Sequence, residues 1–181
     1  MTINFKIVES EKIQGVKIIS PSVSKDHRGN IWTSYLEDSL EIHLPNNKRF
    51  IHDKFSKSKK NVLRGIHGDS KSWKLVTCVY GEIYQVVVDL REESPTYRSW
   101  ISFDISDQNQ MMILIPPGCG NAYYVISENA VYHYKLAYSG KYIDYDGQFT
   151  IPWNDPKLDI TWPTVEPILS SRDSEVINAK N

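Results

Sequence analysis

A histidine inside an apolar stretch is the first candidate for chemistry. His67 lies in the segment Arg64-Gly65-Ile66-His67-Gly68-Asp69, and an imidazole can act as a general base or as a metal ligand. A lone histidine is also common as a purely structural residue, so position alone leaves both interpretations open. Strict alternation along a strand would place Arg64 and His67 on opposite faces. Gly65 favours a β-bulge, which would bring both side chains to one face.

A metal site at His67 would need further His, Cys or carboxylate ligands at suitable spacing. None of the other histidines has a ligand-like spacing to His67. These histidines are His27, His43, His52 and His133. The sequence therefore predicts no metal at this position.

Three further residues have side chains suited to proton transfer beside a carbonyl group. Tyr134 shares a strand face with Tyr132, and a phenol can return a proton to a carbanion, although aromatic packing is the alternative. Lys74 begins an apolar strand and is either an oxyanion-stabilising cation or a solvated edge lysine. Asp173 follows two serines and either orients a histidine or belongs to an ordinary helix cap.

Arginines offer a further function, because a guanidinium can bind a diphosphate through paired hydrogen bonds. Arg28, Arg91 and Arg98 are candidates, with surface solvation as the alternative for each. The chain has neither a P-loop nor a Gly-x-Gly-x-x-Gly sequence, so phosphate binding by a glycine-rich loop is not predicted.

The elements that must position these residues are short strands. Apolar, β-branched runs at 74–80, 81–90, 111–115, 123–126 and 131–136 are each bounded by turn residues. Such spacing predicts an all-β sandwich or barrel. Helix signals are confined to 34–44 and 171–176. Because no linker or repeat interrupts the chain, a single domain over 1–181 is predicted.

Composition excludes several classes of partner. The net charge is −1, without the basic excess that nucleic-acid binding requires. No apolar run approaches the roughly 20 residues that cross a bilayer, so no membrane association is expected. The N-terminal residues do not form a signal peptide, and the two cysteines form no disulfide framework. We therefore expect a cytoplasmic protein.

The order of several motifs along residues 20–175 resembles the dTDP-4-dehydrorhamnose 3,5-epimerase family. In chain order these motifs are Asp26-x-Arg28-Gly29, Leu63-Arg64-Gly65-Ile66-His67, Lys74-Leu75-Val76, Gly81-Glu82-Ile83, Val88-Asp89-Leu90-Arg91, Ser94-Pro95-Thr96-Tyr97, Ile115-Pro116-Pro117-Gly118, Tyr134-Lys135, Trp153-Asn154-Asp155-Pro156, Ile160-x-Trp162-Pro163 and Leu169-Ser170-x-x-Asp173.

The resemblance implies a cupin jelly roll or β-barrel, a homodimer, and no metal or redox cofactor. It also implies roles for six residues of this chain. His67 would be the catalytic base, Asp173 its carboxylate partner, Tyr134 the proton donor and Lys74 the cation beside the substrate ketone, while Arg28 and Arg64 would bind substrate.

The family's reaction explains why these residue types occur together. A ketone at carbon 4 of a nucleotide-linked sugar acidifies the hydrogens on carbons 3 and 5. A base removes one of them, a cation stabilises the enolate, and an acid on the opposite face returns a proton with inversion.

Three departures from the family pattern point to a different substrate. Asn121 stands where the family usually has a histidine, and His52-Asp53-Lys54 replaces a Gln-x-Asn segment. Thr33 stands where an acidic residue is usual. These features resemble a branch that acts on GDP-linked 4-keto-heptoses in capsule biosynthesis. They predict that His52, Lys54 and Asn121 contact the substrate, and that GDP is preferred over dTDP.

Three alternatives remain open at this point. A related isomerase that moves the ketone between carbons 4 and 3 needs the same fold and similar acid–base groups. A non-catalytic sugar-nucleotide-binding cupin is favoured by the absence of a histidine at Asn121. A metal-dependent cupin enzyme is disfavoured by the absence of a His-x-His spacing.

Overall fold

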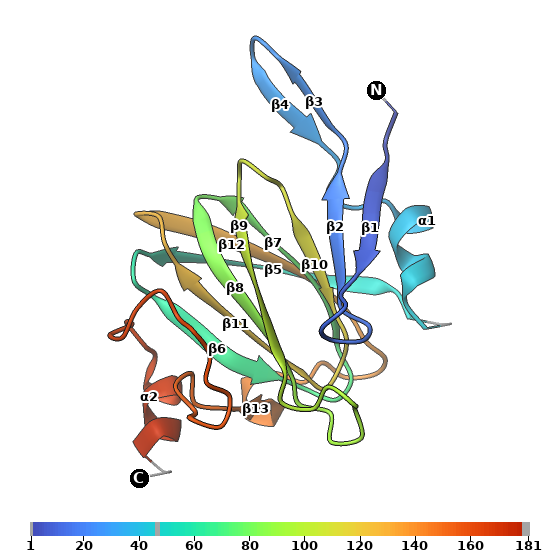
Figure 1. Cartoon of the computed structure of the whole chain (residues 1–181). Helices are drawn as coiled ribbons and strands as arrows, with labels where there is room; N and C mark the ends of the chain where they lie inside the picture. The colour runs from blue at the N-terminus through green and yellow to red at the C-terminus, as the bar shows by residue number, and fades with distance from the viewer. Residues whose placement is uncertain (1, 46–47, 179–181) are drawn as a thin grey trace.

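Two antiparallel sheets face one another in the computed structural model, which describes residues 2–45 and 48–178 (Figure 1). The six-stranded sheet contains, in spatial order, β1 (Phe5–Glu9), β2 (Lys17–Pro21), β10 (Met112–Ile115), β7 (Trp73–Tyr80), β12 (Asn129–Ala137) and β5 (Phe50–Lys59). The five-stranded sheet contains β13 (Phe149–Thr150), β6 (Leu63–Gly68), β11 (Cys119–Val125), β8 (Glu82–Asp89) and β9 (Trp100–Ser106). The predicted all-β cupin architecture is confirmed.

The remaining elements lie at the margins of the sheets. They are the hairpin of β3 (Val23–Asp26) and β4 (Gly29–Trp32), the helix α1 (Glu37–Leu40), the 3-10 turns η1 (Glu41–His43) and η2 (Tyr145–Gly147), and the helix α2 (Ser171–Asn178). The helix predicted over 34–44 is therefore shorter than expected, because Leu36 has an extended backbone and the helical geometry tightens after Leu40. No helix in the described part of the chain is long and apolar enough to cross a membrane.

The main core lies between the two sheets. Val76 and Ile113 of the six-stranded sheet and Val87 and Ile105 of the five-stranded sheet are completely buried in it. Apolar side chains at alternate positions of each strand point to this interior, and their burial is the main force that closes the sandwich.

The outer faces of the sheets are also partly covered, which explains the continuous apolar runs. Leu75 and Leu114 on the outer face of the six-stranded sheet pack with Leu40 of α1. Val86 and Val88 on the outer face of the five-stranded sheet pack with Leu158 from the segment after β13. Strands buried on both faces lose the alternation of apolar and polar residues.

The bulge predicted at Gly65 is present in β6. His67 pairs with Asn121 of β11, but Arg64 pairs with Tyr123, so Gly65 and the next residue face one residue of the partner strand. Gly65 has φ +128°, and a Cβ at this position would lie 2.7 Å from the Cα of Ala122. A side chain therefore cannot be accommodated there. The extra residue brings Arg64 and His67 to the same pocket, as the sequence predicted.

Candidate active site

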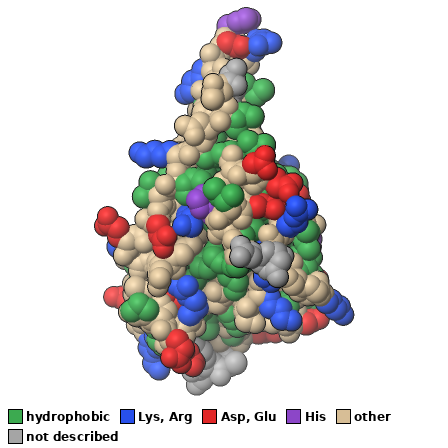
Figure 2. Space-filling view, turned by 90° about the vertical axis from the view of Figure 1, so that its right-hand side faces the viewer, with side chains coloured by type: hydrophobic (Ala, Val, Ile, Leu, Met, Phe, Trp, Pro, Cys, Tyr) green, Lys and Arg blue, Asp and Glu red, His purple; other side chains and the backbone are tan. Residues whose placement is uncertain are grey.

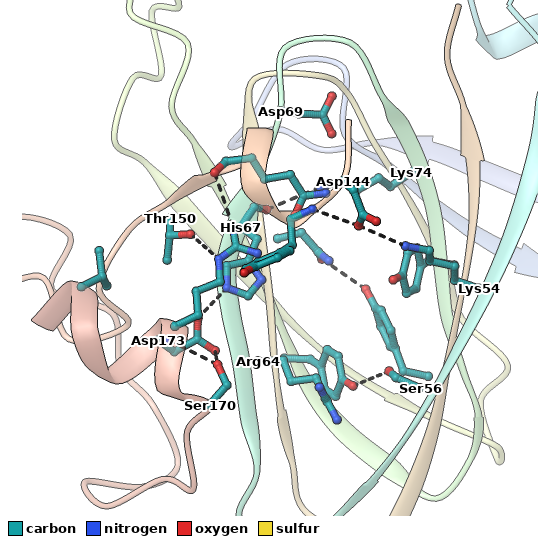
Figure 3. A pocket seen from close by; sticks show the side chains of 18 of the residues that line it. Lys54, Ser56, Arg64, His67, Asp69, Lys74, Asp144, Thr150, Ser170 and Asp173 are labelled. Carbon is teal, nitrogen blue, oxygen red and sulfur yellow. Dashed lines mark hydrogen bonds and ion pairs between the residues drawn. The ribbon is translucent and has the colours of Figure 1, made fainter. Parts of the chain in front are cut away.

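A pocket of about 960 Å³ opens between the two sheets. His67 and Asp173 lie on one side of it, and Lys54 and Lys74 lie on the other (Figure 3). Its lining side chains come from β5, β6, β7, β11, β12, the segment 142–150 and α2. Its polar lining residues include Lys54, Arg64, His67, Lys74, Asn121, Tyr132, Tyr134, Tyr142, Ser170 and Asp173.

The imidazole of His67 is paired with a buried carboxylate. Its Nε2 lies 2.5 Å from Oδ1 of Asp173, whose side chain is 2% exposed. The second oxygen, Oδ2, accepts a hydrogen bond from the hydroxyl of Ser170 at 2.9 Å, and the Asp173 backbone N–H donates to the same hydroxyl oxygen. Asp173 is therefore held in position by α2 and by the serine that precedes this helix.

This pairing decides which nitrogen of His67 can act as a base. A carboxylate only accepts hydrogen bonds, so Nε2 carries the proton that is donated to Asp173. The lone pair is then on Nδ1, which has no partner within residues 2–45 and 48–178. The His67 side chain is 23% exposed and lines the pocket, so a bound molecule can reach this nitrogen.

Lys74 is a buried lysine at the start of β7. It is 7% exposed, and its Nζ donates to the backbone carbonyl of His67 at 3.5 Å. Burial lowers the pKa of Lys74, and the nearby carboxylate of Asp69 opposes this shift. The structure thus excludes the solvated edge lysine that the sequence had left open.

Tyr134 faces the pocket from β12, in the sheet opposite to His67. Burial raises the pKa of its phenol, while the nearby ammonium of Lys54 lowers it in part. The neighbouring Tyr132 is 1% exposed and stacks on Tyr123 with ring centroids 4.2 Å apart. Tyr132 is therefore a residue of the pocket floor, whereas Tyr134 is placed to exchange a proton with a bound molecule.

Two cations that were predicted to bind substrate, Arg64 and Lys54, line the pocket. Arg64 Nε donates to the hydroxyl of Ser58 at 3.0 Å. Lys54 Nζ donates to the phenol of Tyr142 at 3.1 Å and lies 3.6 Å from a carboxylate oxygen of Asp144. Both side chains can bind an anionic group of a ligand, since neither is enclosed by protein on all sides.

Two predicted substrate-binding residues, His52 and Arg28, lie outside the pocket of this chain. His52 packs edge-on against Tyr142, with centroids 4.8 Å apart, so it supports a lining residue instead of lining the pocket. Arg28 lies at the turn of the β3–β4 hairpin, where its side chain is 79% exposed and pairs with Asp26. Figure 2 shows this hairpin projecting from the body with charged side chains at its tip. Arg28 therefore does not line the pocket of its own chain, and its predicted role in substrate binding stays a prediction.

The sequence did not point to two residues that support the site, Gln85 and Arg172. Gln85 is completely buried on β8 and donates to Asn121 Oδ1 at 2.6 Å. Its signal was an uncharged polar residue inside an otherwise apolar run. Arg172 Nε donates to the Thr150 hydroxyl at 2.8 Å and thereby fixes α2 to β13. No sequence pattern identifies that contact, because the two residues belong to segments whose association depends on the complete fold.

The donor groups of the described residues do not form a metal site. No group of three or more His, Cys, Asp or Glu side chains is placed to hold an ion within the part of the chain that the structure describes. Among the described residues that line the pocket, His67 pairs with the single carboxylate of Asp173, and this arrangement suits proton transfer.

Comparisons with known proteins agree with this geometry. The family model described as dTDP-4-dehydrorhamnose 3,5-epimerase matches residues 10–181. The chain belongs to this family. Its members are epimerases, so the prediction of an isomerase is confirmed.

Individual members of the epimerase family match nearly the whole chain. The dTDP-4-dehydrorhamnose 3,5-epimerase of Salmonella typhimurium is 37% identical over 172 residues, which cover 93% of this chain and 92% of the relative. The dTDP-4-dehydrorhamnose 3-epimerase of Streptomyces niveus is 34% identical and covers 91% and 80%. The Legionella pneumophila epimerase structure with dTDP-4-keto-L-rhamnose superposes with a TM-score of 0.87, 35% identity, and coverage of 95% and 91%.

Proposed function

We propose that the chain inverts carbon 3, or carbons 3 and 5, of a nucleotide-linked 4-keto sugar. The observation that carries this proposal is the arrangement around one pocket. A carboxylate-paired histidine comes from one sheet, and a phenol and a buried lysine come from the other. Proton removal and return on two faces of a carbon need a base and a separate acid.

The residues have distinct roles in the proposed reaction. His67 Nδ1 removes the proton from the carbon beside the ketone, and the electron pair of the C–H bond moves into an enolate. Asp173 stabilises the imidazolium that forms. Lys74 stabilises the negative charge on the enolate oxygen. Tyr134 then donates its proton to the opposite face of the carbon, which inverts the configuration.

The identity of the nucleotide that carries the sugar, dTDP or GDP, is a further part of the proposal. By their names, the relatives act on dTDP-linked sugars, and this supports a dTDP-linked 4-keto sugar as substrate. The GDP-linked heptose predicted from the sequence has its support in Lys54 and Asn121, which line the pocket and depart from the family pattern. His52 supports it indirectly, through its contact with Tyr142.

We further infer a homodimer in which the hairpin completes the partner's pocket. The hairpin extends away from its own body (Figure 2), Arg28 at its turn is 79% exposed, and Ile31 beside it is 67% exposed. The apolar Ile31 could pack against a partner subunit, and the guanidinium of Arg28 could then reach an anionic ligand in the partner's pocket. A mixture of Arg28→Ala and His67→Asn chains tests this, because mixed dimers would regain one intact site. Failure to regain activity would contradict shared sites.

The reaction is tested by incubating the protein in deuterated water with dTDP- and GDP-linked 4-keto-6-deoxy sugars. Mass gain counts the exchanged carbons, and the preferred nucleotide is read from the two rates. His67→Asn should abolish deuterium uptake. His133→Asn is the matched control, because His133 also pairs with a carboxylate, Asp53 at 2.7 Å, on the outer face of the sheet.

The outcomes separate the proposed epimerase from its alternatives. Undiminished exchange in His67→Asn would refute the assignment. A product with its ketone at carbon 3, detected by NMR, would identify a ketoisomerase instead. Tight binding of both nucleotide sugars without any exchange in the wild type would identify a non-catalytic binding protein.

A further inference from the structure

A buried amide, that of Gln85, lies behind the pocket-lining side chains of Asn121 and Tyr132 and must form hydrogen bonds. Gln85 lies in the middle of β8 with 0% exposure, between the apolar residues Ile83 and Val86. An amide buried without hydrogen bonds would be strongly destabilising. The side chain makes three contacts: with the backbone carbonyl of Val86 at 3.0 Å, with Asn121 Oδ1 at 2.6 Å, and with the hydroxyl of Tyr132 at 3.0 Å.

The carbonyl of Val86 fixes the orientation of Gln85. A backbone carbonyl only accepts, so the amide nitrogen of Gln85 must face it. The same nitrogen donates to Asn121 Oδ1, and the Gln85 oxygen accepts from Tyr132. Rotation of the Gln85 amide would place two oxygens against each other, and this makes the observed orientation the stable one.

The orientation of Gln85 determines what Asn121 presents to the pocket. Asn121 Oδ1 is used by Gln85 and lies 3.2 Å from the Tyr132 hydroxyl. The amide nitrogen of Asn121 has no protein acceptor among the described residues, and the side chain lines the pocket. Asn121 is also the direct cross-strand partner of His67, so this free N–H₂ group lies beside the proposed base.

We propose that Gln85 and Tyr132 are positioning residues that lock the Asn121 amide with its N–H₂ group toward the sugar, where it donates to a hydroxyl or keto oxygen beside the reacting carbon. The proposal rests on the proposed function for the identity of the ligand. Burial raises the pKa of Tyr132 well above its ordinary value, so the network stays uncharged. The Asn121 amide does not titrate, so it keeps its N–H₂ donor at every pH.

The variant Asn121→Asp tests the N–H₂ group of Asn121, because it removes this donor and keeps an acceptor for Gln85. One carboxylate oxygen can still accept from Gln85, and the other replaces the pocket-facing N–H₂ group by an acceptor. We expect sugar-nucleotide binding, measured by calorimetry with dTDP- and GDP-linked 4-keto-6-deoxy sugars, to weaken by about 10-fold or more. Binding of dTDP or GDP alone should be unchanged, since the donor faces the sugar. Equal weakening for the nucleotide alone, or no weakening, would overturn the proposal.

Gln85→Glu tests the positioning role through pH. An ionised carboxylate cannot donate to Asn121 Oδ1, so the Asn121 amide would rotate and turn its oxygen to the sugar. A buried carboxyl has a raised pKa and regains a donor when protonated, so the deficit in sugar binding should be about 10-fold near pH 9 and small near pH 6. A deficit that is equal at both pH values would show that Gln85 is merely structural.

Gln110→Glu is the matched control for this variant. Gln110 is also buried, at 3% exposure, and donates to the Asp107 backbone carbonyl away from the pocket. It should lower the melting temperature without a pH-dependent change in sugar binding. If Gln85→Glu fails to fold, Asn121→Asp alone decides the proposal. If the wild-type protein catalyses no deuterium exchange, the proposed function is refuted. The binding measurements test the role of Asn121 and Gln85 independently of that result.

Discussion

His67 and Tyr134 face one pocket from opposite sheets, His67 from β6 and Tyr134 from β12. A sugar ring bound between the sheets would present one face to each residue. The sandwich thus separates the proposed base from the proposed acid by a fixed gap, and neither residue depends on a loop for its position. Inversion of a carbon centre requires this separation, because proton removal and return on a single face would only restore the starting sugar.

Tyr134→Phe should separate exchange from inversion. His67 would still remove and return a proton on its own face, so deuterium uptake should persist, while formation of the inverted sugar should fall by roughly 100- to 10,000-fold. NMR of the product measures both quantities. Tyr138→Phe is the control, because Tyr138 contacts His52 outside the pocket lining. Normal inversion by Tyr134→Phe would show that another acid returns the proton.

Lys74 should produce an alkaline limb in the pH–rate profile. Burial lowers its pKa from the ordinary 10.5, so the cation is lost, and the rate falls, at a lower pH than for a free lysine. Lys74→Met should reduce the rate by about 100-fold or more and remove this limb. Lys135→Met, which breaks a 2.7 Å ion pair with Asp53, should keep it. If the Lys74→Met variant keeps the alkaline decrease in rate, that decrease arises from the titration of another group.

Gly65→Ala should disrupt both the fold and the site. The φ of +128° and the overlap with Ala122 are each unfavourable for a side chain, and we expect a loss of at least about 2 kcal/mol in the free energy of unfolding. Gly140→Ala is the control, since Gly140 also has a positive φ but no atom within 4 Å of its added Cβ. Chemical denaturation compares the two. Equal costs would show that the bulge tolerates a side chain.

The free energy of unfolding should depend on pH through the ionisation of Asp89. Burial raises its pKa, but Arg91, Ser94 and Thr96 donate to it and together hold the pKa below the ordinary 3.8. Because the pKa of Asp89 is lower in the folded state than in the unfolded chain, the ionised carboxylate stabilises the fold at pH values above the unfolded-state pKa. This stabilisation is lost as the pH falls toward the folded-state pKa. Asp89→Asn should therefore cost about 2 kcal/mol above roughly pH 5 and progressively less below about pH 4. Denaturation midpoints across this range test it, and a cost independent of pH would contradict it.

Much of the fold could be predicted from local patterns. The runs at 74–80 and 131–136 correspond to β7 and β12, because strands with apolar inner faces carry their signal in their own residues. β11 begins at Cys119, earlier than predicted, because Gly118 and Gly120 resemble a turn. Glycine stands at position 120 of this strand for packing and not for a turn, because an added Cβ would lie 2.4 Å from the side chain of Ile66.

The site was predictable only where a motif marked it. His67, Lys74, Tyr134 and Asp173 meet at one pocket as the resemblance implied. Gln85 could not be assigned a role, because its partners belong to two other strands. The substrate contact predicted for Arg28 stays a prediction, since a sequence motif does not state which pocket an exposed residue of a hairpin serves.

The position of Asp173 also orders events during synthesis. Asp173 follows His67 by 106 residues and reaches it only through α2. A nascent chain that has emerged through β13 contains every strand of both sheets but lacks the carboxylate of the dyad. Such a partly emerged chain could complete neither the pair of His67 with Asp173 nor the side of the pocket that Ser170, Arg172 and Asp173 line.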